Sequence, residues 1–375
     1  MSLDKRIKYC DFLRGLAMIL VILIHIYSIY RGIYFNKNKI YYFILSLGDS
    51  FTRIAVPTFF MITGIFMLNK SYDESYKDYL LKRMPKLIVT FIIFSGIYYI
   101  YEAHRTSNEL SILYFCQILT TYGGFKYHLW FMYEIIRIYF LIPFISVLVK
   151  NLTREKLKDL IILIFILGNI LQFSQWFTYK YEINLFAGIS FSSLAICTNY
   201  LLLGYYLFKY DISKKSRIKI YIVGIISIFL MPIADIIYLG NVRSGDDVIY
   251  TVSSIFPIFP AIGIFVLFKY NYNKFHVPAV IEKVMSKIAK NSLYIYMVHV
   301  IILEYLNRFL QNLFNIDSFI QVILLIFILL ILTTILSLIC SVIINYIYNF
   351  VEDKIKKIIR MWKGKIYEKQ KNRQN

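Results

Sequence analysis

Two side chains able to do chemistry lie in the first apolar segment, residues 9–30. Arg14 and His25 have ten residues between them. Eleven steps of about 100° carry an α-helix through about three turns, so both side chains lie on one face, roughly 16 Å apart along the axis. A guanidinium binds anions such as phosphate, and a neutral imidazole accepts protons as a general base. This pattern predicts that the segment does more than anchor the chain.

The composition indicates which elements must position these two side chains. Hydrophobic residues make up 59% of the chain, aromatic residues 18% and charged residues 17%, which is typical of a polytopic membrane protein. Apolar stretches long enough to cross about 30 Å of hydrocarbon recur along the chain. We predict ten spans, at 9–30, 46–68, 86–102, 129–149, 159–175, 190–208, 218–239, 251–268, 291–312 and 318–347. The predicted fold is therefore all-α, a polytopic integral membrane helical bundle with about ten transmembrane helices.

Basic residues predict the orientation of these helices, since short cytoplasmic loops carry an excess of lysine and arginine. Such residues are frequent before the first span, in alternate connections and in the tail after Glu352, and they are sparse in most of the opposite loops. Both termini are therefore predicted to be cytoplasmic, although Arg31, Lys37 and Lys39 in the first outer loop run against the trend. We divide the chain into a membrane domain, 1–350, and a basic cytoplasmic tail, 351–375.

Several classes of function are disfavoured by charge and cysteine usage. The net charge is +20, but the cations lie at the ends of spans, so topology and anionic lipid explain them better than nucleic acid does. The four cysteines are widely spaced and show neither zinc-ligand spacing nor a disulfide framework, so we expect no metal. The first apolar stretch is too long for a cleavable signal and is predicted to remain as a span.

Polar side chains within a bilayer cost about 3 kcal/mol at a helix centre and usually face a cavity or a partner. Asp11 and Arg14 have the spacing of a local pair, and the same spacing predicts a structural ion pair between Glu134 and Arg137. His25 has no local partner of opposite charge in the sequence. The remaining candidates of this kind are Asp49, Arg53, Arg83, His128, Asp235, His299, Glu304 and Arg308.

Five stretches, in this order, resemble the membrane-bound acyltransferase-3 family over nearly the whole chain. They are DFLRG at 11–15 followed by His25, PTFFMITG at 57–64, KRMPK at 82–86, HLWFMY at 128–133 and NSLYIYMVH at 291–299. Thr63 stands where the family usually has a serine and keeps the hydroxyl, whereas the charges of Glu134 and Arg137 depart from the family pattern.

The resemblance implies a membrane O-acyltransferase, most directly an O-acetyltransferase. Such an enzyme moves an acyl group from cytoplasmic acyl-coenzyme A, commonly acetyl-coenzyme A, to a hydroxyl of a cell-surface or lipid-linked glycan. Arg14 and His25 would be the catalytic pair, with His25 acting as general base or carrying the acyl group itself. Arg14, Arg83 and Arg53 would bind the donor. The expected substrate-binding residues are His128, Trp130, Tyr294 and His299, with Trp130 also suited to be an interfacial anchor.

Two other classes of function remain open from the sequence. Buried charges on about ten helices also suit an exopolysaccharide exporter, although the prolines show no matching pattern in two halves. A sensor or assembly subunit without catalysis would use Arg14 and His25 for packing alone. We expect a multi-pass protein of a bacterial plasma membrane, in contact with lipid. It would work alone, as a homo-oligomer or with a separate extracytoplasmic partner.

Overall fold

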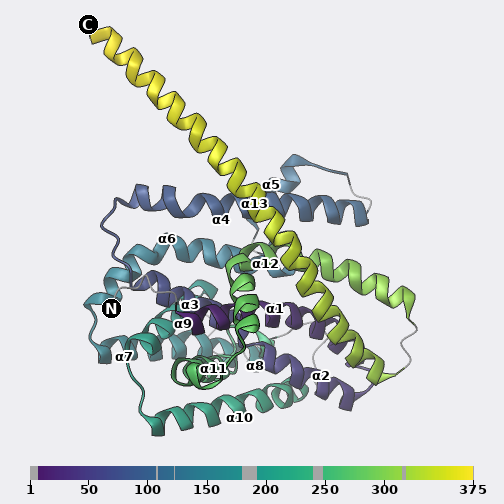
Figure 1. The fold of residues 1–375 in the computed structure, drawn as a ribbon. Helices are drawn as coiled ribbons and strands as arrows, with labels where there is room; N and C mark the ends of the chain where they lie inside the picture. The colour runs from purple at the N-terminus through teal and green to yellow at the C-terminus, as the bar shows by residue number, and fades with distance from the viewer. Residues whose placement is uncertain are drawn as a thin grey trace. The chain divides into compact units, whose positions relative to one another are not determined.

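The computed structural model describes residues 7–106, 109–121, 123–179, 192–239, 248–314 and 318–374 (Figure 1). The side chains of 176–179, 238–239 and 355–374 are not among the described ones. All regular elements of the described residues are helical, which confirms the all-α prediction. The chain divides into two compact units, Met1–Val277 and Pro278–Asn375.

The first unit contains most of the helices. In chain order they are α1 (Lys8–Tyr34), α2 (Lys39–Thr52), α3 (Ala55–Leu68), α4 (Tyr76–Thr106), α5 (Ile112–Thr120), η1 (Tyr127–Leu129), α6 (Trp130–Asn151), α7 (Arg154–Ile164), η2 (Phe165–Ile170), α8 (Leu171–Tyr179), α9 (Ser193–Lys209), α10 (Lys214–Leu239), η3 (Val248–Tyr250), α11 (Ile258–Asn271) and η4 (Tyr272–Lys274). The second unit contains α12 (Ala279–Leu313) and α13 (Phe319–Gln374).

Among the described residues, eight helical segments are long and apolar enough to cross a membrane. They confirm that the chain is a multi-pass membrane protein. One of them, Lys39–Leu68, joins α2 to α3 across a break at Arg53 and Ile54, so the predicted span 46–68 crosses that break. The predicted spans 190–208 and 251–268 correspond to the shorter helices α9 and α11, and residues 190 and 191 lie outside the described ranges.

The prediction of helix at the start of 251–268 is wrong, because α11 begins only at Ile258. The preceding backbone is irregular, and its carbonyl groups find partners on neighbouring helices. The Asn169 side chain, in the π-helical turn η2, donates to three of them, with nitrogen–oxygen distances of 3.2 Å to the carbonyl oxygens of Val252, Ser253 and Ser254. The hydroxyl of Tyr200 also donates to Val252 at 3.0 Å. Non-helical backbone is tolerated at membrane depth where protein groups satisfy it.

Helices α3 and α9 pack closely against each other in the first unit (Figure 1). A Cβ atom added at Gly64 would lie 2.1 Å from the carbonyl oxygen of Leu201, and one added at Gly204 would lie 2.1 Å from that of Met61. Only glycine allows the two backbones to approach this closely. The glycine of the 57–64 motif therefore has a packing role, and α3 in turn contacts α1 and α6.

In the second unit, α12 and α13 pack against each other (Figure 1). The ring centroids of Tyr294 and Tyr348 lie 6.3 Å apart in this pair. Helix α13 continues without interruption past residue 350, so no break in the helix marks the predicted boundary between the membrane domain and the tail. The division at 350 and 351 therefore remains a prediction.

Candidate functional site

One group of polar and aromatic side chains surrounds Arg14 in the N-terminal half of α1. The Arg14 guanidinium carbon lies 5.4 Å from the ring centroid of Phe66 on α3. The positive charges of Arg14 and of Arg83, on α4, both act on the side chain of Tyr139, on α6. Two of the arginines that the sequence predicts as donor ligands, from helices α1 and α4, therefore lie within electrostatic range of the same tyrosine.

Tyrosine side chains lie near Arg83. The Tyr79 hydroxyl donates to the backbone carbonyl of Tyr139 at 2.8 Å, which joins α4 to α6. The ring centroid of Tyr72, in the loop before α4, lies 5.2 Å from that of Tyr79. Burial raises the pKa of the Tyr72 hydroxyl to about 12, although the nearby positive charge of Arg83 acts in the opposite direction. Tyr72 is therefore a neutral hydrogen-bonding group beside Arg83 at neutral pH.

A second group surrounds His25, farther along the same helix. The His25 ring centroid lies 5.1 Å from that of Tyr127 and 6.2 Å from that of His128, both in η1. The ring of Tyr98, on α4, lies 5.0 Å from the His128 ring, and both side chains are buried. The predicted catalytic histidine and one predicted substrate residue, which are remote in sequence, are thus near neighbours.

Aromatic packing holds η1 in this place. Phe59 and Phe60 of α3 lie against Phe131, with ring centroids 6.1 and 5.1 Å apart, and Phe131 in turn contacts Trp130 at 6.3 Å. The motifs at 57–64 and 128–133 therefore meet in one aromatic layer next to the two histidines. Trp130 is partly buried in that layer at the start of α6.

Arg53 belongs to a different cluster. Its guanidinium forms a bidentate ion pair with Asp49, at 2.8 and 2.7 Å, and donates to the carbonyl of Tyr250 at 3.2 Å. Asp49 is completely buried and also accepts from Arg31 at 2.8 Å. This cluster joins the C-terminal end of α1 to α2 and to η3. Its described contacts point to a structural task for Arg53, which sequence reasoning did not predict.

Two further predicted site residues lie in the second unit. Tyr294 and His299 are both buried in α12. The Nδ1 atom of His299 lies 2.6 Å from the carbonyl oxygen of Tyr296, which requires a proton on Nδ1. The roles of Tyr294 and His299 in substrate binding remain predictions.

The predicted ion pair between Glu134 and Arg137 is confirmed, at 3.1 Å. Glu134 also accepts a short hydrogen bond from the hydroxyl of Ser193, at the start of α9. No local pattern in the sequence predicts the Ser193 contact, because it joins α6 to a helix almost sixty residues away in the chain. Glu304 and Arg308 on α12 are 3.9 Å apart.

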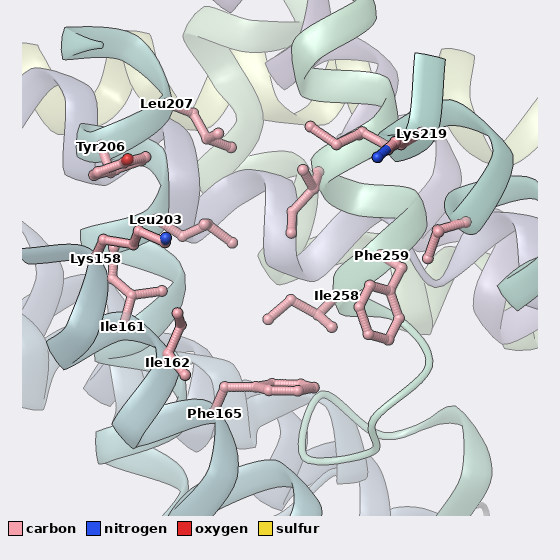
Figure 2. Close-up of a pocket in the computed structure, with 13 residues that line it drawn as sticks. Lys158, Ile161, Ile162, Phe165, Leu203, Tyr206, Leu207, Lys219, Ile258 and Phe259 are labelled. Carbon is pink, nitrogen blue, oxygen red and sulfur yellow. The ribbon is translucent and has the colours of Figure 1, made fainter. Parts of the chain in front are cut away.

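One cavity formed by described residues of the first unit is apolar. It has a volume of about 420 Å³ and is enclosed by α7, α9, α10, α11 and η2 (Figure 2). Ile162, Phe165 and Ile258 are among its apolar lining residues, while Lys158 and Lys219 lie at its edge. Acyl transfer needs polar groups that stabilise the charge developing in the transition state. The apolar lining makes this cavity unsuitable for that step.

Another cavity is polar and aromatic and has a volume of about 710 Å³. It is formed by the C-terminal end of α4, by α5 and by the residues before η1, and Tyr127 is one of its lining residues. Tyr127 is also the residue that contacts His25. Sequence reasoning missed this cavity, although the aromatic and charged side chains between 99 and 127 were a signal for it.

The helices and the two side-chain groups define a multi-pass membrane protein with the partly buried polar groups Arg14 and His25 along one helix. Its family follows from comparison with known proteins. The family model of acyltransferase family 3, described as an acyltransferase domain, matches residues 7–342. The chain belongs to this family and is a membrane acyltransferase, as the five motifs predict. A search of curated proteins and a search of solved structures each returned no match.

In the described part of the chain, no group of three or more His, Cys, Asp or Glu side chains is arranged to hold a metal ion.

Proposed function

We propose that this protein is an O-acyltransferase that moves an acetyl group from cytoplasmic acetyl-coenzyme A to a hydroxyl of a cell-surface or lipid-linked glycan. The observation that carries the proposal is the arrangement along α1. Arg14 lies in one group with Arg83, and His25 lies roughly 16 Å farther along the helix in a second group with His128. With the predicted orientation in a bacterial plasma membrane, the first group faces the cytoplasmic donor and the second the outer acceptor.

The arginine group suits the anionic end of the donor. Coenzyme A carries several phosphates, and the guanidinium groups of Arg14 on α1 and Arg83 on α4, which both act on Tyr139, offer charge-assisted hydrogen bonds to them. The Tyr72 hydroxyl beside Arg83 donates to the backbone carbonyl of Met67 at 2.8 Å and so holds the loop between α3 and α4 next to this group. The long arm of coenzyme A then extends between the helices, along α1, and brings the thioester to His25.

The histidine group suits the transfer step. His25 accepts the proton of the glycan hydroxyl while that oxygen forms a bond to the thioester carbonyl carbon. The carbon–sulfur bond then breaks, the ester remains on the glycan, and the coenzyme A thiolate takes the proton from His25. His128, whose ring lies 6.2 Å from that of His25, is a candidate to donate a hydrogen bond to the developing oxyanion. Transfer through an acyl-histidine at His25 uses the same groups in two steps.

Binding of acetyl-coenzyme A to the detergent-purified protein tests the proposal by calorimetry. We expect saturable binding to the wild type and to His25→Ala, and binding weakened about tenfold or more in Arg14→Ala, because a charge-assisted phosphate contact is lost. Transfer of labelled acetyl groups should be absent in His25→Ala. Arg154→Ala is the matched control, since Arg154 is an exposed arginine at the start of α7 and lies outside the Arg14 group.

The outcomes separate the possible functions. No binding of acetyl-coenzyme A to a folded wild-type protein contradicts the proposal and favours polysaccharide export. Full transfer activity in either Arg14→Ala or His25→Ala contradicts the assigned roles of these residues. Equal weakening of donor binding by Arg154→Ala would show a general effect of charge rather than a contact made by Arg14.

A further inference from the structure

The polar cavity next to His25 has walls of two kinds. Tyr99, Tyr114 and Phe125 supply aromatic rings, and Glu102 and Lys126 supply charged groups. Its volume of about 710 Å³ lies within the range of small-molecule sites. By the predicted orientation of α4, this cavity lies on the outer side of the membrane.

The cavity walls are held in place by contacts among themselves. The Tyr99 hydroxyl donates to the carbonyl of Ser111 at 3.1 Å and accepts from the Ser111 backbone nitrogen at 2.6 Å, which ties α4 to the start of α5. Phe115 and Phe125 stack with ring centroids 5.5 Å apart. Gly124 adopts a φ of +59°, which favours glycine, where the chain turns toward η1. A pocket built in this way is preformed rather than assembled by its ligand.

The charges in the cavity indicate what kind of ligand fits. Glu102 forms ion pairs with Arg105 at 2.9 Å and with Lys126 at 2.5 Å, so one carboxylate engages both cations. Glu109 is the fourth charged lining residue, and the formal charge of the lining is balanced. A polyphosphate such as coenzyme A requires an excess of positive charge. A ligand rich in hydroxyl groups instead uses carboxylates as acceptors and aromatic rings as apolar surfaces.

One residue connects the cavity with the proposed catalytic group. Tyr127 lines the cavity, and its ring centroid lies 5.1 Å from that of His25. Tyr127 therefore borders both the cavity and the imidazole. An acceptor hydroxyl has to come within hydrogen-bond reach of the general base, and a site that shares a side chain with the His25 group favours this approach.

We propose that this cavity binds the glycan acceptor, with a sugar ring on the Tyr114 side of the aromatic wall and a hydroxyl directed past Tyr127 to His25. The inference rests on the proposed function, because it assigns the acceptor half of that reaction. It adds Tyr114 and Glu102 as acceptor-binding residues, whereas the arginine group binds the donor. Substitutions in the cavity should therefore lower transfer to the acceptor without weakening the binding of acetyl-coenzyme A.

The test measures transfer in membranes that contain the native acceptor, with radiolabelled acetyl-coenzyme A as donor and label in the polysaccharide fraction as the readout. Tyr114→Ala should lower incorporation about tenfold, because the loss of one stacking surface in the pocket changes affinity by about that factor. Tyr114→Phe keeps the ring and should stay within about threefold of the wild type, as expected for a contact made by the ring face. Glu102→Gln should lower incorporation as well.

Two controls make the result specific. Tyr114 is 51% exposed, so its replacement is compatible with folding, and Phe51→Ala removes a similarly exposed aromatic ring, 46% exposed, that does not line the cavity. Binding of acetyl-coenzyme A to each purified variant is measured by calorimetry. Donor binding should stay within about twofold of the wild type in the cavity variants, because these residues lie outside the arginine group.

Wild-type incorporation in both Tyr114→Ala and Glu102→Gln overturns the inference and leaves the proposed function intact. Loss of donor binding in Tyr114→Ala also overturns it, since the cavity would then serve the donor or the fold. Absence of donor binding in the wild type instead overturns the proposed function. The two failures are therefore distinguishable.

Discussion

The buried cluster around Asp49 allows one prediction to be worked out from the geometry. Asp49 is completely buried and accepts three charge-assisted hydrogen bonds, from Arg31 at 2.8 Å and from Arg53 at 2.8 and 2.7 Å. Asp49→Asn keeps the shape of the side chain but removes its charge and replaces one acceptor oxygen by a donor. Removing one partner of a buried ion pair costs about 3–5 kcal/mol, because the remaining charge stays desolvated.

The expected cost lies at the lower end of that range. Two features lower the cost. The negative charge of Asp235 still stabilises the positive charge of Arg31. The Arg53 side chain is 12% exposed, so its charge is not completely desolvated. We therefore predict a loss of about 3 kcal/mol in the free energy of unfolding of Asp49→Asn. The measurement is unfolding of the purified protein by sodium dodecyl sulfate in mixed micelles, followed by circular dichroism.

The matched control is Lys82→Ala. Lys82 pairs with Glu74, but its side chain is 62% exposed, so its removal should change the free energy of unfolding by no more than about 1 kcal/mol. A change of that size in Asp49→Asn as well would refute the reasoning, since the buried cluster would then contribute no more than a surface pair. The cluster also fixes the end of α1 six residues beyond His25, so acetyl transfer should fall in Asp49→Asn while donor binding persists.

The remaining predictions concern separate features of the molecule. His25→Gln should lower the rate of acetyl transfer by about 10²–10⁴-fold with donor binding unchanged, as loss of a general base does, measured with labelled acetyl-coenzyme A. Gly64→Ala should lower the free energy of unfolding by about 1–3 kcal/mol, because the added Cβ atom would clash with the Leu201 carbonyl. Gly96→Ala is the control in the same unfolding assay, since a Cβ atom added at Gly96 has nothing within 4 Å. Asn169→Ala should cost about 1–3 kcal/mol by removing the side-chain donor to the carbonyl groups of Ser253 and Ser254, while the Val252 carbonyl keeps the Tyr200 hydroxyl; unchanged unfolding would contradict this role of Asn169.

Much of the candidate site could be predicted because it depends on spacing along one helix. Arg14 and His25 lie on the same helix, so their relation follows from helical geometry alone. The neighbours of each could not be predicted in the same way. His128 comes close to His25 because aromatic residues of α3 and α6 pack together, and Arg31 joins the Asp49–Arg53 pair only through the packing of α1 against α2.

By itself, the sequence determined the class of fold, most of the membrane-spanning segments and the family. These properties rest on hydropathy over about 20 consecutive residues and on short motifs, both of which are local along the chain. Only the tertiary structure decided that the backbone before α11 leaves the helix and that a polar cavity opens beside Tyr127. Both depend on hydrogen bonds and packing between residues that are far apart in sequence, which local patterns do not encode.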